Sequence, residues 1–332
     1  MENVNWGMIG CGQVTEVKSG PGLYKSNNSS LVGVYNAHYD KAVDYIKRHG
    51  IAKAYRTVED LLADETIDIV YIATPPKFHK EYAIQCLKAG KIPYIEKPVA
   101  ITYGECLEIK ALSEELNIPV YVAFYRRGLE KFLKIKEFLD NKEIGDIRYV
   151  NVTQIMKVED SELDREKLAW RVIPEISGGG KFLDMGVHVI DCLTLYFGEM
   201  ESINGIVENK GGYYDADDTV VASFKFKNGI VGSGTWCYVA DKNINEVQIV
   251  GDNGRIVYDG LSAKSFTLIK NGLETIFEFE QPEHIAMPYQ QAVVNELIGK
   301  GKSFANFKEA INTVEMTEML LKNYYRRGVE KC

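Results

Sequence analysis

The sequence predicts an amino-terminal α/β domain with a doubly wound parallel sheet (a Rossmann domain), followed by an α+β domain with a large, mostly antiparallel open sheet. Three observations predict this. Short apolar runs alternate with helical patterns in the first third of the 332 residues. A glycine-rich turn follows the first apolar run. After about residue 125, runs of alternating polarity are separated by Asn-Gly turns, which are typical of hairpins. We therefore expect domains at 1–124 and 125–332, with the last helix free to pack back on the first domain.

In the first domain, the apolar runs predict strands at 4–9, 31–35, 69–73, 92–95 and 119–124. Helices between them have recognisable ends. Gly50 and Gly90 stand where glycine closes a helix, and the pairs Thr57/Asp60 and Thr102/Glu105 resemble capping boxes. Strands that alternate with helices at this spacing pair in parallel.

In the second domain, the pattern predicts three hairpins, whose turns contain Asn228-Gly229, Asn253-Gly254 and Asn271-Gly272. The remaining expected elements are helices at 129–139, 181–197, 283–298 and 307–326, a strand from 147, and period-two runs at 219–226, 230–238, 246–250 and 266–269. The chain shows neither internal repeats nor low-complexity segments.

The net charge of −8 and the lack of any long Lys/Arg run disfavour nucleic acids and anionic membrane surfaces as partners. The first residues carry no basic leader, and no apolar run is long enough to cross a bilayer. The six cysteines are scattered without a C-x-x-C pair, so we expect reduced thiols and no cysteine-type zinc site. These features predict a soluble, cytoplasmic protein.

The first strand runs into Gly10-Cys11-Gly12-Gln13-Val14-Thr15, which is a G-x-G-x-x-T motif. Gly10 would allow a tight turn, and Gly12 would let a pyrophosphate approach the backbone at the start of the next helix. The third position holds Thr15 instead of the usual Gly or Ala. At the first strand–helix junction of a βαβ array, this motif predicts a dinucleotide site.

The second strand leads into Asn36-Ala37-His38, where an acid normally binds the 2′-hydroxyl of the adenosine ribose. Asn36 lacks the carboxylate that would repel a 2′-phosphate, and His38 would be able to approach one. NAD and NADP both stay open, with a slight preference for NADP.

Two further strand ends should border the dinucleotide, because ligands of open parallel sheets lie beyond the carboxyl ends of the strands. Thr74-Pro75 follows one strand, with His79 early in the next helix. Glu96-Lys97-Pro98 follows another, and Lys97 places a cation at the mouth of the sheet.

Three glycines, Gly178 to Gly180, precede an apolar helix that carries Asp184, His188 and Asp191. Asp184 and His188 are spaced i, i+4, so we expect them on one helix face. A metal site made of these three side chains is an alternative to a catalytic acid–base pair.

Together these segments resemble the glucose-fructose oxidoreductase, inositol dehydrogenase and rhizopine-catabolism (Gfo/Idh/MocA) family. Glu96-Lys97-Pro98 and the block from Gly178 to Asp191 carry the resemblance most specifically, with support from Trp170-Arg171. The resemblance implies an NAD(P)-dependent dehydrogenase of sugars or polyols. We expect no metal site. It also implies a homodimer or homotetramer formed through the carboxyl-terminal sheet.

The resemblance further implies roles for single residues. Lys97 would bond the reacting hydroxyl, His188 would accept its proton, and Asp184 would position the substrate or the histidine. Trp170 and Arg171 would shield the nicotinamide, and Tyr125 would join Lys97, Asp184 and His188 in binding substrate. The implied coenzyme-binding positions are Gly10, Gly12, Gln13, Val14, Asn36, Ala37, His38, Thr74, Pro75, His79, Glu96, Lys97, Trp170 and Arg171.

Histidine suits the chemistry, because removing a hydride from a carbinol carbon requires a base that titrates near neutrality. Lys97 comes from the first expected domain and His188 from the second, so we expect a site that exists only when the domains are packed together. Two other functions compete with this one. A glycosidase that uses bound NAD for transient oxidation and elimination would need the same coenzyme, and a non-catalytic dinucleotide sensor would need no proton acceptor.

Overall fold

The computed structural model describes residues 2–329, with side chains through residue 325. The chain divides into two compact units. Unit 1 comprises residues 1–100, 104–129 and 281–307, and unit 2 comprises residues 101–103, 130–280 and the chain from 308 onward. The helix at 287–297 therefore belongs to unit 1, whereas the sequence led us to expect a single division at 124/125.

Unit 1 contains a six-stranded sheet in the order β3-β2-β1-β4-β5-β6, and all of its strand pairs are parallel. The expected doubly wound sheet is confirmed. β3 was missing from the ranges that we predicted, because it is only three residues long and partly exposed. The strands are β1 (Val4–Ile9), β2 (Ser29–Tyr35), β3 (Lys53–Tyr55), β4 (Ile69–Ile72), β5 (Ile92–Ile95) and β6 (Tyr121–Val122).

Local sequence signals set the helix ends of unit 1. Gly50 closes α3 with a φ of 68°, and the Thr57 hydroxyl accepts the Asp60 N–H at 3.0 Å to cap α4. The helices are α1 (Gln13–Val17), α2 (Gly22–Lys25), α3 (Tyr39–His49), α4 (Val58–Leu62), η1 (Pro76–Phe78), α5 (His79–Lys88), α6 (Tyr103–Leu116), η2 (Tyr125–Gly128) and α10 (Met287–Leu297).

Helix α10 completes the core of unit 1, although it lies more than 150 residues after β6 in the sequence. Its Tyr289 is 1% exposed, and its ring centroid lies 6.3 Å from that of Tyr94 on β5. Gly128 in η2 lets the α10 backbone come close, because an added Cβ there would lie 2.5 Å from the Tyr289 backbone. Aromatic and aliphatic side chains of the sheet therefore pack on α10.

Unit 2 is built on an eight-stranded sheet in the order β14-β13-β12-β11-β7-β10-β9-β8. All pairs are antiparallel except β7 with β10, which confirms a mostly antiparallel sheet with hairpins at the three Asn-Gly turns. The strands are β7 (Ile147–Lys157), β8 (Met200–Glu208), β9 (Thr219–Phe226), β10 (Val231–Ala240), β11 (Ile244–Gly251), β12 (Arg255–Tyr258), β13 (Ser265–Lys270) and β14 (Leu273–Glu278).

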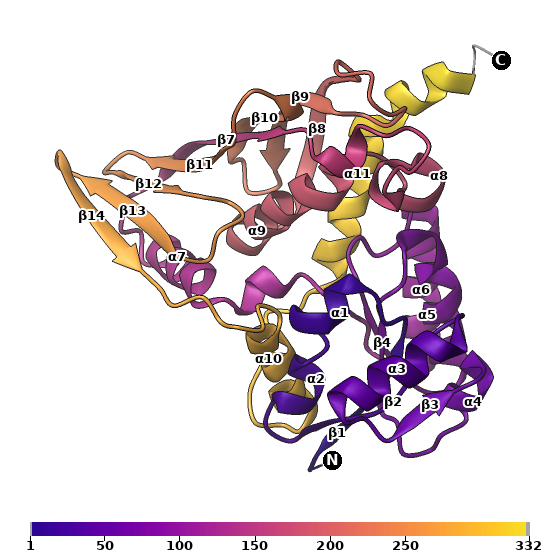
Figure 1. Cartoon of the computed structure of the whole chain (residues 1–332). Helices are drawn as coiled ribbons and strands as arrows, with labels where there is room; N and C mark the ends of the chain where they lie inside the picture. The colour runs from indigo at the N-terminus through magenta and orange to yellow at the C-terminus, as the bar shows by residue number, and fades with distance from the viewer. Residues whose placement is uncertain (1, 330–332) are drawn as a thin grey trace. The chain divides into compact units, whose positions relative to one another are not determined.

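One face of this sheet is buried against helices, and α7 and α9 run along it (Figure 1). Along β9, for example, Val220, Ala222 and Phe224 are buried while Val221 is 47% exposed. This period-two burial is what a sheet with one covered face requires. The other face carries exposed apolar residues within the single chain: Tyr149, Ile206, Val221, Val231 and Ile276.

The helices of unit 2 include one departure from the expected pattern. The predicted helix at 181–197 is helical throughout, but the α-helix α9 begins at Val187 and Phe182–Gly186 form a π-helix. Its wider turn changes the i, i+4 relation that we expected between Asp184 and His188. The remaining helices are α7 (Glu130–Asp140), η3 (Asp160–Glu162), η4 (Trp170–Val172), α8 (Pro174–Ser177), α9 (Val187–Phe197) and α11 (Phe307–Val329).

Among the helices of residues 2–329, none has the length and apolar character needed to cross a membrane.

Candidate functional site

The turn between β1 and α1 has the geometry that a dinucleotide pyrophosphate needs. Gly10 has a φ of 94°, and an added Cβ there would lie 2.8 Å from the Ala73 carbonyl oxygen. A Cβ on Gly12 would meet nothing within 4 Å, so the backbone at Gly12 is open to a ligand at the start of α1, which begins with Gln13 and Val14. The residues present therefore fit a dinucleotide.

Thr15 occupies the third motif position without disturbing this turn. Its side chain is buried, and its hydroxyl donates to the Gly12 carbonyl at 2.8 Å. The Thr15 carbonyl accepts the Tyr45 hydroxyl at 2.9 Å. Threonine thus ties the turn to the helix by a hydrogen bond where the usual glycine would do so by close packing.

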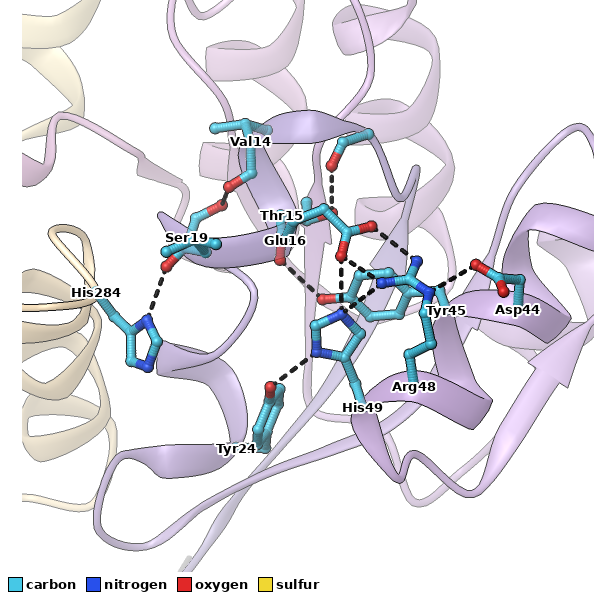
Figure 2. A network of polar contacts seen from close by, with 12 residues as sticks. Val14, Thr15, Glu16, Ser19, Tyr24, Asp44, Tyr45, Arg48, His49 and His284 are labelled. Atoms are coloured by element: carbon cyan, nitrogen blue, oxygen red, sulfur yellow. Dashed lines mark hydrogen bonds and ion pairs between the residues drawn. The ribbon is translucent and has the colours of Figure 1, made fainter.

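A polar network between α1 and α3 supports the turn (Figure 2). The Arg48 guanidinium binds both oxygens of Glu16, at 2.6 and 2.9 Å, and holds the pKa of that carboxyl to about 2. The His49 ring stacks on Tyr45 with centroids 4.1 Å apart, and its Nε2 donates to Glu16 at 3.0 Å. The network therefore links α1 to α3, and it could not be predicted because Glu16 is more than 30 residues from Arg48 and His49.

At the end of β2, the Asn36 side chain contacts both the turn and the chain that follows. Its Nδ2 donates to Cys11 Sγ at 3.3 Å, and its Oδ1 accepts the His38 N–H at 2.9 Å. Ala37 and His38 are exposed. The Arg56 guanidinium, just past β3, lies 4.2 Å from the Tyr39 ring centroid.

The ends of β4 and β5 are joined by His79. Its Nδ1 lies 2.8 Å from the Pro98 carbonyl oxygen and its Nε2 lies 2.8 Å from that of Thr74. The side chain is fully buried, and burial lowers its pKa. Both ring nitrogens thus contact the backbone of the two loops, and the expected contact of His79 with coenzyme stays a prediction. Pro75, beside Thr74, is half-buried at the strand end.

Glu96 and Lys97 follow β5 as expected. The Glu96 carboxylate accepts the Tyr71 hydroxyl and also the Lys97 N–H, the latter at 3.1 Å. Glu96 is thus directed toward the sheet, where it shapes the loop that carries Lys97. Tyr125 lies in η2, just after β6, and its ring is 4.9 Å from the Arg126 guanidinium carbon.

In unit 2 the structure brings Trp170, Arg171 and Asp184 together. Arg171 Nε lies 3.2 Å from Asp184 Oδ2, and its guanidinium carbon lies 4.6 Å from the Trp170 ring centroid. Asp184 is in the π-helix, while His188 is the second residue of α9 and is 6% exposed. π-Helical turns occur frequently at functional sites.

A buried ion pair anchors the segment that carries Trp170 and Arg171. Lys181 Nζ lies 2.8 Å from Glu162 Oε1, and each side chain is 4% exposed. Glu159 adds a second carboxylate at 3.0 Å and forms a capping box with Glu162. No local pattern links Lys181 to Glu159 or Glu162, so these partners were missed.

Asp217 was also missed. It is fully buried, its Oδ1 accepts the Gly180 N–H at 2.7 Å and the Tyr325 hydroxyl at 2.6 Å, and burial raises its pKa. An added Cβ on Gly180 would lie 2.0 Å from the Asp217 carbonyl oxygen. Gly180 therefore allows close packing against Asp217, just before the π-helix.

The alternative of a metal site at Asp184, His188 and Asp191 finds no support. No group of three His, Cys, Asp or Glu side chains in the described part of the chain is arranged to hold a metal ion. Asp184 contacts Arg171 instead.

The predicted residues thus fall into two sets. Unit 1 gathers Gly10, Gly12, Gln13, Val14, Asn36, Thr74, Glu96 and Lys97 at the carboxyl ends of four neighbouring parallel strands. Unit 2 gathers Trp170, Arg171 and Asp184 at the π-helix that precedes His188. The carboxyl ends of the strands, where the unit 1 set lies, form the edge at which open parallel sheets bind ligands.

Comparisons with known proteins agree with this geometry. Residues 4–124 match the family model described as the oxidoreductase family with an NAD-binding Rossmann fold. Residues 132–257 match the model of the GFO/IDH/MocA carboxyl-terminal domain.

Oxidoreductase P35 of Formosa agariphila is 39% identical over 310 residues, which cover 92% of this chain and 95% of that protein. Trans-1,2-dihydrobenzene-1,2-diol dehydrogenase of Xenopus laevis is 24% identical, over 90% of this chain and 86% of its own length. Among solved structures, levoglucosan dehydrogenase in complex with NADH and levoglucosan has a TM-score of 0.84 at 23% identity, with 98% of each chain covered.

Proposed function

Because the chain belongs to the Gfo/Idh/MocA family of NAD(P)-binding oxidoreductases, we propose that it transfers a hydride between NADP and a secondary hydroxyl or carbonyl group of a sugar, a sugar derivative or a cyclic polyol. The observation that carries the proposal is the placement of Lys97 directly after β5, at the carboxyl edge of a dinucleotide-type sheet. Two relatives named above, the dihydrobenzenediol and levoglucosan dehydrogenases, bear the names of hydroxylated ring compounds.

The preference for NADP rests on the end of β2. Asn36 has no carboxylate to repel a 2′-phosphate, and Arg56 supplies a cation next to Tyr39, the first residue of α3. NADP would supply the hydride acceptor at its nicotinamide ring.

The side chains of this chain would handle the proton and the developing charge. We assign His188 as the base that accepts the hydroxyl proton and Lys97 as the cation that donates to the substrate oxygen. Asp184, held by Arg171, would orient the substrate or the histidine, and Tyr125 would contact substrate. Trp170 and Arg171 would exclude water from the nicotinamide.

The proposal gives the two units different roles. Unit 1 would bind the dinucleotide and unit 2 would contribute substrate contacts. The open, partly apolar face of the eight-stranded sheet would pair with a second copy in a homodimer or homotetramer, because exposed apolar patches commonly mark interfaces. We also propose that the protein works in the cytoplasm.

The test is turnover of a panel of aldoses, inositols, deoxy and amino sugars with NADP or NAD, followed by nicotinamide absorbance. Lys97→Ala and His188→Ala should lose most of the turnover while still binding coenzyme in calorimetry. Near-normal turnover in both variants would end the assignment. Size-exclusion chromatography with light scattering tests the oligomer, and a monomer would contradict that part.

A further inference from the structure

Cys11 and Asn36 are neighbours at the ends of adjacent strands. Ile9 and Tyr35, the last residues of β1 and β2, are paired. Cys11 lies two positions after Ile9, and Asn36 lies one position after Tyr35. Asn36 Nδ2 donates to Cys11 Sγ at 3.3 Å, and both residues are half-buried. Burial raises the pKa of the Cys11 thiol, so the sulfur stays protonated at neutral pH and accepts through a lone pair.

The opposite side of the same amide is fixed as well. The backbone N–H of His38 donates to Asn36 Oδ1 at 2.9 Å. If the amide were rotated by half a turn, its NH₂ group would face the His38 N–H, donor against donor. The sulfur and the backbone N–H therefore hold one orientation between them.

This orientation decides which polar atom of Asn36 is left for a ligand. One lone pair of its oxygen accepts the His38 N–H, and one of its amide hydrogens is directed to Cys11. The second amide hydrogen is a donor only. A donor makes a charge-assisted, hence stronger, hydrogen bond to a phosphate, whereas the 2′-hydroxyl of NAD is normally bound by a carboxylate that accepts its proton.

We propose that Cys11 is a specificity-determining residue for the coenzyme: its sulfur orients the Asn36 amide so that an N–H faces the 2′ position and selects the 2′-phosphate of NADP. The inference rests on the proposed function, because it requires that unit 1 binds NADP in preference to NAD. Cys11 acts through Asn36 and is therefore a positioning residue.

The experiment measures the dissociation constants of NADP and NAD by calorimetry on the full chain, for the wild type, Cys11→Ala and Cys11→Ser. Without the sulfur, only the His38 N–H holds the amide in this orientation, so Cys11→Ala should reduce the NADP/NAD preference about three- to fivefold. Cys11→Ser keeps an acceptor and should restore part of it. Cys237→Ala is the matched control, because Cys237 is also half-buried and accepts the Thr219 hydroxyl at 3.7 Å in unit 2.

Each outcome separates the two claims. A wild type that prefers NADP, together with a lowered ratio in Cys11→Ala and an unchanged ratio in Cys237→Ala, supports the inference. An NADP-preferring wild type whose ratio is unchanged in Cys11→Ala, even if both affinities fall, overturns the role of Cys11 and leaves the NADP proposal intact. A wild type that binds NAD as tightly as NADP overturns both.

Discussion

Breaking the Lys181–Glu162 ion pair is expected to be the most destabilising polar change in unit 2. Both side chains are 4% exposed, and Nζ lies 2.8 Å from Oε1, so water does little to screen a charge left alone. Lys181→Met leaves the buried Glu162 without its cation and should cost about 5 kcal/mol of unfolding free energy. Glu162→Gln should cost about 3 kcal/mol, because Lys181 keeps Glu159 at 3.0 Å.

The double variant Lys181→Met/Glu162→Leu removes both charges and should lie within about 1 kcal/mol of the wild type, since apolar replacement of a buried pair is often nearly neutral. Urea unfolding followed by tryptophan fluorescence measures these values. Trp236 reports on unit 2, because it is buried with its ring centroid 5.1 Å from that of Phe182. Single variants that each cost under about 1 kcal/mol, or a double variant no better than Lys181→Met, would refute the reasoning.

Three further predictions concern the supports of the site. The Glu16 pKa of about 2 lies below its ordinary 4.5, so its contribution is present above pH 4.5 and is lost as the pH falls toward 2; Glu16→Gln should flatten the acid limb of the stability curve, and parallel curves would contradict this. Tyr325→Phe removes the hydroxyl that donates to Asp217 Oδ1 at 2.6 Å, and it should lower the unfolding free energy by about 1–3 kcal/mol in thermal unfolding. Tyr324→Phe is the control, because it removes a hydroxyl that donates to the Asp215 carbonyl at the surface, and it should cost under about 1 kcal/mol. His79→Phe should raise KM for coenzyme at least fivefold, because the loops lose the imidazole that lies between the carbonyls of Thr74 and Pro98. An unchanged KM would show that the two loops keep their positions without the imidazole.

Much of the fold was predictable because its signals are local. The parallel sheet follows from strand–helix alternation, and the hairpins follow from Asn-Gly turns at which Gly229 and Gly272 have φ values of 91° and 75°. The carboxyl ends of β1, β2, β4 and β5 meet at one edge of the sheet, so Gly10, Asn36, Thr74 and Lys97 could be assigned to one region.

The rest depends on contacts between distant parts of the chain. The π-helix does not appear in a 3.6-residue pattern. Only glycine fits at position 186 of this helix, because an added Cβ would lie 2.6 Å from the Phe182 ring. The contacts of His79 could not be predicted either, because the two carbonyl groups beside its ring come from loops that only the folded sheet brings to it. Asp217 and Tyr325 are 108 residues apart, and no periodicity links them.

The measurement that tests the central claim most directly is NADP reduction by the sugar and polyol panel, run in parallel for the wild type and His188→Ala, with calorimetric NADP binding for both. We predict turnover by the wild type with at least one cyclic polyol or sugar. In His188→Ala we predict a loss of at least a hundredfold in kcat with nearly unchanged NADP affinity, as expected when a general base is removed. Equal turnover by the two proteins would contradict the account. Tight NADP binding with no turnover on any member of the panel would instead favour a dinucleotide sensor.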